Sequence, residues 1–542
     1  MLNAISPKRS SAKTLLAALR TLNLVADSRI LQHPLHAAHP DLFADLLYTE
    51  HGLENLAQVI SQQSPSWTVQ QQISLAAKLL SKTCHDESHR RLIEEARLYD
   101  VLAAKLASFV VATGCSLAGS YGSHTALGPP APEKAELASI LYAIVTILDT
   151  SKARWTRFLA APAFGAVFPK TYPEGPTSFS ARKLSLNHIE SLIPHLQNSC
   201  RTLPTTPNFP PLGAIGTSSQ PSLRAFGFSI ESADHAAEGH ESPLVPWLIY
   251  MARADTDALA RLMALHAVTH LHRCGLTHKR REAESATILV PLLAIMLDKN
   301  PVASKGLLTS LRSDDKADRR LIEEQAPAVL AKLIDDILDL QRAAIEAGSI
   351  KKLSQILKKS FDPLPPHSTT LLWSPEPTMS DRKGPSEELP FGSPGLSPAA
   401  YHVTCMRESA LKGLAAIASL KDDYRRSIIE NGIVPFIIQS LKPYDVESPA
   451  SQLRPHIDDS KGPIAVTQNP KEVIIAACGL AQGLSRSVST LRTSLMDAGL
   501  AAPLFLLLRH QDIEIQIAST AVVCNLVLDF SPMRQVSKVL GR

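Results

Sequence analysis

The chain has 542 residues, and its 55 lysines and arginines nearly balance 51 aspartates and glutamates, leaving a net charge of +4. So small a charge gives no electrostatic argument for a nucleic-acid partner. Aromatic residues make up 5% of the chain and there are 24 glycines, which disfavours an α/β enzyme with many tight turns and favours helices rich in leucine and alanine. The seven cysteines include no CxxC pair, which is typical of reduced thiols and excludes a disulfide framework or a CxxC-type zinc site.

The longest apolar run, 137–148, is flanked by acidic residues and falls short of the roughly 20 residues that span a bilayer. We therefore expect no transmembrane segment. The first 26 residues carry four basic side chains and no acid. Such a start is compatible with a mitochondrial targeting peptide and equally with the first helix of a repeat protein.

Residues 487–529 contain the signals that begin and end three successive helices. A short helix is expected to end at Gly499, where a left-handed conformation costs glycine no steric penalty. A second follows, with Pro503 tolerated in its first turn, and Asp512 is placed to cap a third helix that runs to about Leu528. We expect the apolar face of that third helix to be formed by residues at three- and four-residue spacing: Ile513, Ile517, Ala521, Cys524 and Leu528.

Similar segments recur at 48–106, 341–357 and 407–441, with Gly52 and Ala96 at equivalent points. A period of about 40 residues with three helices per unit is the armadillo/HEAT signature. One such unit cannot bury enough apolar surface to fold alone, so neighbours must stack. The predicted fold is all-α: an armadillo/HEAT-type right-handed superhelical solenoid with Pro-rich insertions.

The repeats are expected to alternate with segments rich in Pro, Ser, Thr and Gly that lack apolar periodicity. Helical repeats are predicted at 1–116, 135–169, 244–360, 401–442 and 471–534. The predicted linker is 117–134, and the predicted disordered insertions are 170–243, 361–400 and 443–470. The last predicted segment is a short tail, 535–542.

Several patterns could carry chemistry. His266, His270 and Cys274 share one helix face and could hold zinc, but the sequence HAVTH lacks the acidic residue of a zinc hydrolase, so interface histidines are preferred. The basic run 278–281 could be a nuclear signal or a phosphate contact, and a solvated helix start explains it as well. The acidic pair Glu323 and Glu324 is interpreted as a polar helix face. No nucleotide-binding or nucleophile motif is found, so we expect neither an enzyme nor a cofactor or metal.

Armadillo proteins that bind extended peptides carry an asparagine on each third helix, whose amide pairs with the peptide backbone. Here Asn525 occupies that place in the last repeat, but Gly483, Ala416 and Lys78 replace it elsewhere. This departure weakens a peptide-import function and leaves a protein-binding groove of another kind open. Polar positions chosen as candidate protein-binding residues are Arg486, Gln516, Ser519 and Asn525.

The strings LSRSVSTLRTSLMDAG and CNLVLDFSPMR within 473–534 resemble the armadillo repeat-containing protein 8 family. The resemblance implies a non-catalytic scaffold of the GID/CTLH E3 ubiquitin ligase, in the cytoplasm and nucleus. Its partners would be LisH-CTLH-domain and RING subunits, held through the earlier part, and a substrate receptor held by the later repeats. Where relatives begin another repeat, this chain ends in QVSKVLGR, so the resemblance also suggests a C-terminal truncation that puts receptor binding in question.

Three other functions remain open from the sequence. The first is an armadillo adaptor for another protein cargo or a trafficking complex. The second is a mitochondrial helical-repeat protein, which the acid-poor start would suit. The third, an enzyme, would require the zinc site at His266 and His270.

Overall fold

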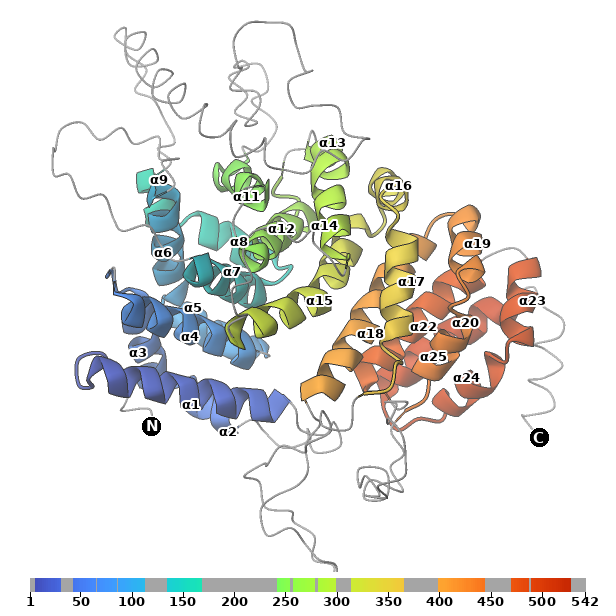
Figure 1. The fold of residues 1–542 in the computed structure, drawn as a ribbon, viewed down its shortest axis with the longest axis horizontal. Helices are drawn as coiled ribbons and strands as arrows, with labels where there is room; N and C mark the ends of the chain where they lie inside the picture. The colour runs from blue at the N-terminus through green and yellow to red at the C-terminus, as the bar shows by residue number, and fades with distance from the viewer. Residues whose placement is uncertain are drawn as a thin grey trace, which may run out of the picture. The chain divides into compact units, whose positions relative to one another are not determined.

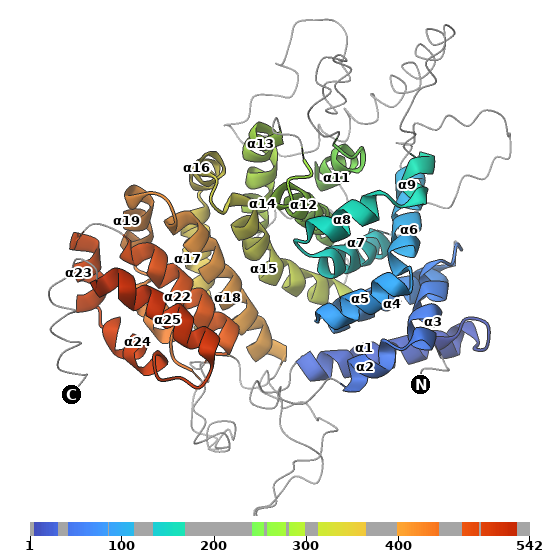
Figure 2. The same cartoon turned by 180° about the vertical axis from the view of Figure 1, so that it is seen from behind.

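The computed structural model describes residues 5–30, 42–112 except 65 and 85, 134–167, 241–298 except 254–256 and 278–280, 313–364, 398–443, and 469–527 except 487 and 488. Regular structure in these ranges is helical, apart from an isolated bridge between Pro443 and Asn469. The chain forms two compact units, Met1–Ala26 with Asp41–Arg281 and Asp27–Pro40 with Glu282–Arg542, called unit 1 and unit 2 (Figures 1 and 2). None of the described helices is long and apolar enough to cross a bilayer.

Unit 1 is built on successive long helices that pack against one another. These are α1 (Ala12–Ile30), α4 (Trp67–Thr83), α7 (Lys134–Leu148) and α12 (Ala258–Arg273). Side chains of α1 and α4 join the two helices, because Asn23 Nδ2 donates to the Leu75 carbonyl at 2.9 Å and Gln72 Nε2 donates to the Ala12 carbonyl at 2.7 Å. The remaining helices of this unit are α2 (Leu42–Leu47), α3 (Glu50–Ile60), α5 (Glu87–Glu95), α6 (Leu98–Ala112), α8 (Lys152–Leu159), α9 (Pro162–Val167) and α11 (Leu244–Arg253).

Unit 2 repeats a three-helix pattern in which the third helices stack. The stack runs from α15 (Ser313–Ile334) through α18 (Pro398–Ala418) and α22 (Lys471–Ser485) to α25 (Ile513–Val527), coloured yellow-green to red in Figure 1. Along the chain, two shorter helices precede each of α18, α22 and α25. These pairs are α16 (Leu338–Glu346) with α17 (Ser349–Lys359), α19 (Asp422–Glu430) with α20 (Val434–Ser440), and α23 (Ser489–Asp497) with α24 (Ala501–Leu507). Before α15 come α13 (Arg281–Glu284), the short π-helix η4 (Ser285–Leu289) and α14 (Val290–Met296). The expected all-α armadillo-type repeats are confirmed.

The tight turn between the two short helices uses a left-handed residue. Gly348, Gly432 and Gly499 have φ of +75°, +67° and +90° after α16, α19 and α23, so the expectation for Gly499 is confirmed. The proposed equivalence of Gly52 and Ala96 is wrong. Gly52 lies in the first turn of α3, and after α5 the left-handed position belongs to Arg97, with φ +54°. A non-glycine residue there bears a steric cost.

The cap expected at Asp512 is also confirmed, because its carboxylate accepts a hydrogen bond from the Glu514 amide at 2.9 Å. Pro503 lies in the first turn of α24, where no intrahelical donor is lost. Pro327, by contrast, lies inside α15. Because proline has no N–H, it deprives the Glu323 carbonyl of the usual helical hydrogen bond.

Most of the segments expected to separate the repeats lie outside the described residues. The parts outside are 117–133, 170–240, 365–397, 444–468 and the tail 535–542. Two of their expected edges fall inside described helices: Lys134 begins α7, and Pro398 begins α18. Helix α11 begins at Leu244, as the expected repeat did.

Candidate protein-binding sites

The last described third helix, α25, buries a different face from the one that the sequence suggested. Its buried residues are Ile515, Ser519, Val522 and Leu526, whereas Ile513 and Ile517 are 69% and 64% exposed. Both sets follow helical spacing, and the buried set includes the polar residue Ser519. The hydroxyl of Ser519 is satisfied within the helix, because it donates to the Gln516 carbonyl at 3.0 Å. The predicted apolar face is therefore wrong.

This result also corrects the role proposed for Ser519, because a fully buried side chain cannot line a binding groove. The exposed stripe of α25 instead consists of Ile513, Ile517, Thr520 and Cys524. These four residues recur at four- and three-residue spacing, so they lie on one side of the helix.

The other three candidate residues keep some exposure. Arg486 is exposed at the C-cap of α22. Gln516 and Asn525 are half-buried and already bonded: Gln516 Nε2 donates to the His510 carbonyl at 2.7 Å, and Asn525 Nδ2 donates to the Gln482 carbonyl at 3.2 Å. The amide of Asn525 thus ties α25 to α22, and a peptide would have to displace that bond.

The surroundings of Gly483 in α22 explain why this position does not carry an asparagine. A Cβ at Gly483 would lie 3.1 Å from Cβ of Ala418, because α22 passes close to α18 at this point. Ala416, the preceding equivalent, is also buried, and its carbonyl accepts from Gln341 Nε2 at 2.7 Å. Close packing of α22 against α18 therefore leaves little room for an asparagine at Gly483, and the equivalent position in α18, Ala416, is buried.

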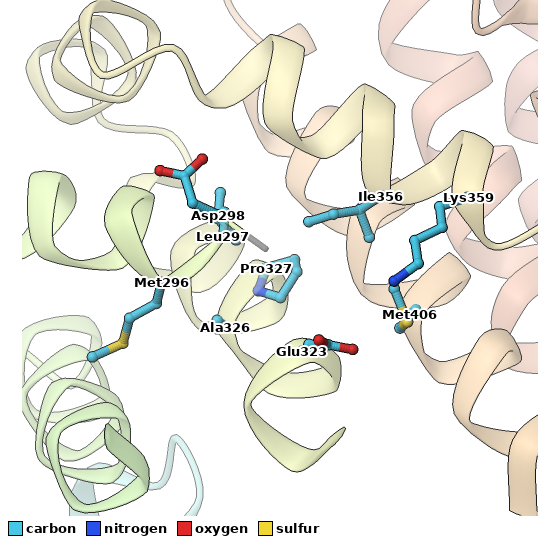
Figure 3. Close-up of a pocket in the computed structure, with 9 residues that line it drawn as sticks. All are labelled: Met296, Leu297, Asp298, Glu323, Ala326, Pro327, Ile356, Lys359 and Met406. Carbon is cyan, nitrogen blue, oxygen red and sulfur yellow. The ribbon is translucent and has the colours of Figure 1, made fainter. Parts of the chain in front are cut away.

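A small hollow opens between α14, α15, α17 and α18 (Figure 3). Its volume of about 20 Å³ is far below the roughly 300–1,000 Å³ of small-molecule sites. The floor is buried and apolar, and half-buried or exposed side chains form the rim. Floor residues are Leu297, Ala326, Pro327, Ile356 and Met406; rim residues are Met296, Asp298, Glu323 and Lys359.

Both carboxylates on the rim are paired. Asp298 Oδ2 lies 2.9 Å from Nζ of Lys352, and Glu323 Oε2 lies 3.3 Å from Nε2 of His402. Nδ1 of His402 lies 2.7 Å from Glu324 Oε1. The hydrogen bond from His402 holds the pKa of Glu323 below its ordinary value. Burial lowers the pKa of His402, but its bonds to the two carboxylates outweigh this effect and raise it.

The sequence did not reveal this arrangement. Glu323 and Glu324 were interpreted as a solvated helix face, and instead they bind a histidine from the next third helix. Helix periodicity cannot show a partner 78 residues away. Pro327, standing inside a helical pattern, was the one local signal near the hollow.

The histidine and cysteine pattern of unit 1 packs into the interior. His266 and His270 are 8% and 1% exposed, and their ring centroids lie 4.4 Å apart in an edge-on arrangement. Burial raises the pKa of Cys274, whose thiol donates to the Thr150 carbonyl at 3.3 Å. A protonated thiol is a poor zinc ligand.

Residues 278–280 of the basic run lie outside the described residues. Its last member, Arg281, is 8% exposed and forms two-pronged bonds with the Glu241 carboxylate at 2.9–3.2 Å. The guanidinium of Arg281 is thus bonded to a carboxylate within unit 1.

The stacked three-helix repeats place the chain in the class of armadillo-type helical repeat proteins. No protein-family model matches it. A designed armadillo repeat protein in complex with the peptide (KR)4 covers 55% of this chain and 87% of its own, at 15% identity and a TM-score of 0.33, a likeness too low to carry an argument.

Two sequence relatives define the resemblance further. The chain is 26% identical to GID complex subunit 5 of Schizosaccharomyces pombe over 279 residues, which cover 52% of this chain and 28% of that protein. It is 27% identical to Armadillo repeat-containing protein 8 of Pongo abelii over 257 residues, which cover 47% and 31%. The family resemblance found in the sequence is therefore confirmed, and the match spans less than a third of each relative's length.

Proposed function

We propose that the chain is a non-catalytic armadillo scaffold of a GID/CTLH-type E3 ubiquitin ligase, linking the substrate receptor to the catalytic core for ubiquitin-dependent protein degradation. The observation that carries this proposal is the similarity, over about half the chain, to a protein named GID complex subunit 5. Its partners would be LisH-CTLH-domain and RING subunits and a substrate receptor. It would act in the cytoplasm and nucleus.

Two cysteines of unit 2 have the properties of structural thiols, as a scaffold allows. Burial raises the pKa of Cys405 and that of Cys478 to about 12, so both stay protonated at neutral pH and are poor nucleophiles. The hollow of about 20 Å³ in unit 2 leaves room for about one water-sized group. What unit 2 offers instead is helical surface.

Within this proposal, the receptor would bind the exposed stripe of α25. Ile513 and Ile517 are more than half exposed on one face of the helix, and single apolar residues become contact sites when a partner covers them. Arg486, Gln516 and Asn525 on α22 and α25 supply polar groups for the same end of unit 2. A receptor bound here would contact an apolar centre with polar groups around it.

Co-expression of the chain with the CTLH, RING and receptor subunits of its own organism, followed by size-exclusion chromatography, tests the proposal. The scaffold should co-elute with both the core and the receptor. Ile517→Glu, which places a charge on the stripe, should release the receptor and keep the core. The matched control is Leu24→Glu, because Leu24 is 68% exposed on α1, and this variant should keep the receptor. Elution of the unaltered chain alone would refute the scaffold function.

A further inference from the structure

We propose that the exposed stripe of α25 joins two copies of the chain, with the stripe of one copy packed against the same stripe of the other. The stripe consists of Ile513, Ile517, Thr520 and Cys524. This inference does not depend on the ubiquitin-ligase assignment, because self-association is measured on the chain alone. A receptor bound to the same stripe would exclude the second copy.

The preceding third helix presents the same row of positions. Helices α22 and α25 both have 15 residues, and Ile513 at the start of α25 corresponds to Lys471 at the start of α22. All four residues of the stripe are exposed, whereas none of their equivalents on α22 is exposed. These equivalents are Lys471, Ile475, Cys478 and Gln482.

The row on α22 is covered by the helix that follows it. At one end, Nζ of Lys471 lies 2.8 Å from Oδ2 of Asp512, which caps α25. At the other end, the Gln482 carbonyl accepts a hydrogen bond from Asn525 Nδ2 at 3.2 Å. Each third helix thus presents a row that suits another third helix, and on α25, the last one that the structure describes, this row stays exposed.

The charges of this surface favour a second copy as the partner. Pairing of identical surfaces brings like charges together, so a surface that pairs with itself must be uncharged, as this stripe is. The charged groups beside the stripe already pair with one another, because Nζ of Lys471 lies 2.8 and 3.1 Å from the carboxylates of Asp512 and Glu514. A strongly acidic or basic partner would find no opposite charge on the stripe.

Two-fold symmetry and size define the expected dimer. A two-fold axis across the stripe places two α25 helices antiparallel, so the central residue Ile517 of one copy lies near Ile517 of the other. Helix α25 has 15 residues and is about 22 Å long. One face of such a helix is smaller than the roughly 800 Å² that each partner of a stable complex buries. The dissociation constant should therefore be on the order of 10–100 μM.

Sedimentation equilibrium of the whole chain, from about 1 to about 200 μM, tests the proposal. The chain should be a 58.7 kDa monomer at the lowest concentration and mostly a dimer at the highest. Ile517→Glu places two carboxylates at the centre of the dimer, so it should raise the dissociation constant at least about tenfold. The matched control is Leu24→Glu on α1, where Leu24 is 68% exposed, and this variant should dimerise like the unaltered chain.

A mixing experiment tests the two-fold arrangement. Ile517→Glu and Ile517→Lys should each be monomeric, and an equal mixture of the two should dimerise, because opposite charges then meet. Circular dichroism of each variant checks that it is folded. A mixture that associates no more than its components would overturn the proposal, as would equal dissociation constants for Ile517→Glu and the unaltered chain.

A folded, unaltered chain that stays monomeric at about 200 μM would also overturn the proposal. Labelling of Cys524 with a maleimide then identifies what covers the stripe. Slow labelling of the monomer would show that another part of the same chain lies over it, whereas fast labelling would show that the stripe is free.

Discussion

Nδ1 of His402 on α18 lies 2.7 Å from Oε1 of Glu324 on α15. Its other ring nitrogen faces Glu323 at 3.3 Å, so both nitrogens meet acceptors and the ring is bonded best as an imidazolium. One residue thereby joins consecutive third helices through a charge whose pKa the two carboxylates raise above its ordinary value.

The pH dependence of stability follows from this bridge. Because the folded-state pKa of His402 is raised above 6.5, its contribution is full below pH 6.5 and is lost as the pH rises through the folded pKa. The pKa of Glu323 is lowered from 4.5, so its contribution is full above pH 4.5 and is lost as the pH falls through the folded pKa. Between these limits His402→Gln should lower the free energy of unfolding by about 1–3 kcal/mol.

Thermal melts from acid to alkaline pH, monitored by circular dichroism, check this prediction. The difference in Tm between the unaltered chain and His402→Gln should shrink as the pH rises beyond the folded pKa of His402. Lys359 on α17 and Arg319 on α15 also act on Glu323, and neither residue is altered in the variant. A Tm difference that stays constant across the whole pH range would contradict the bridge.

The second prediction is that substitution of Arg407 strongly lowers the stability of the fold. The Arg407 side chain is fully buried on α18, with NH2 donating to the Ser360 carbonyl at 2.7 Å and the guanidinium 3.6 Å from the centre of the Phe361 ring. NH1 donates to the side-chain oxygen of Asn469. Lysine lacks the several N–H donors and the planar cation that make these contacts. Arg407→Lys should therefore lower the free energy of unfolding by about 3 kcal/mol or more.

Urea unfolding followed by tryptophan fluorescence and circular dichroism measures that cost. The control is Lys412→Ala on the same helix, whose side chain is 50% exposed and pairs with Glu408. Its effect should stay within about 0.5 kcal/mol. Equal effects of the two substitutions would show that the buried guanidinium is dispensable.

Two glycines on α22 give a prediction about the spacing of the third helices. A Cβ at Gly479 meets nothing within 4 Å, whereas one at Gly483 meets Ala418 at 3.1 Å. Gly479→Ala should therefore raise stability by about 1 kcal/mol, and Gly483→Asn should lower it by about 1–3 kcal/mol through crowding. Differential scanning calorimetry of both variants compares them directly, and a stable Gly483→Asn protein would remove the packing explanation for the missing asparagine.

The left-handed turns predict opposite signs for two substitutions. Arg97 is exposed at φ +54°, so Arg97→Gly should stabilise unit 1 by about 0.5–1 kcal/mol. Gly499 has φ +90°, so Gly499→Ala should destabilise unit 2 by about 1–2 kcal/mol. Thermal melts of the two variants should shift in opposite directions, and a shared direction would show that the backbone conformation does not decide the outcome.

Local signals were enough for the helix pattern but not for the contacts between repeats. Gly499 and Asp512 act within their own turns, and the structure places both as the sequence indicated. The buried face of α25 was misassigned because two stripes share the same helical spacing, and packing against α22 chose the one with Ser519. The bridge at His402 joins residues 78 positions apart, a distance over which helix periodicity carries no information.

The most direct test of the scaffold function is affinity purification of the chain, tagged at its own locus, in mild salt, with mass spectrometry of the intact complex. The account predicts recovery of LisH-CTLH-domain and RING subunits in fixed stoichiometry, together with a substrate receptor. A folded, helical chain recovered without CTLH and RING subunits would contradict the account and favour an adaptor for another cargo.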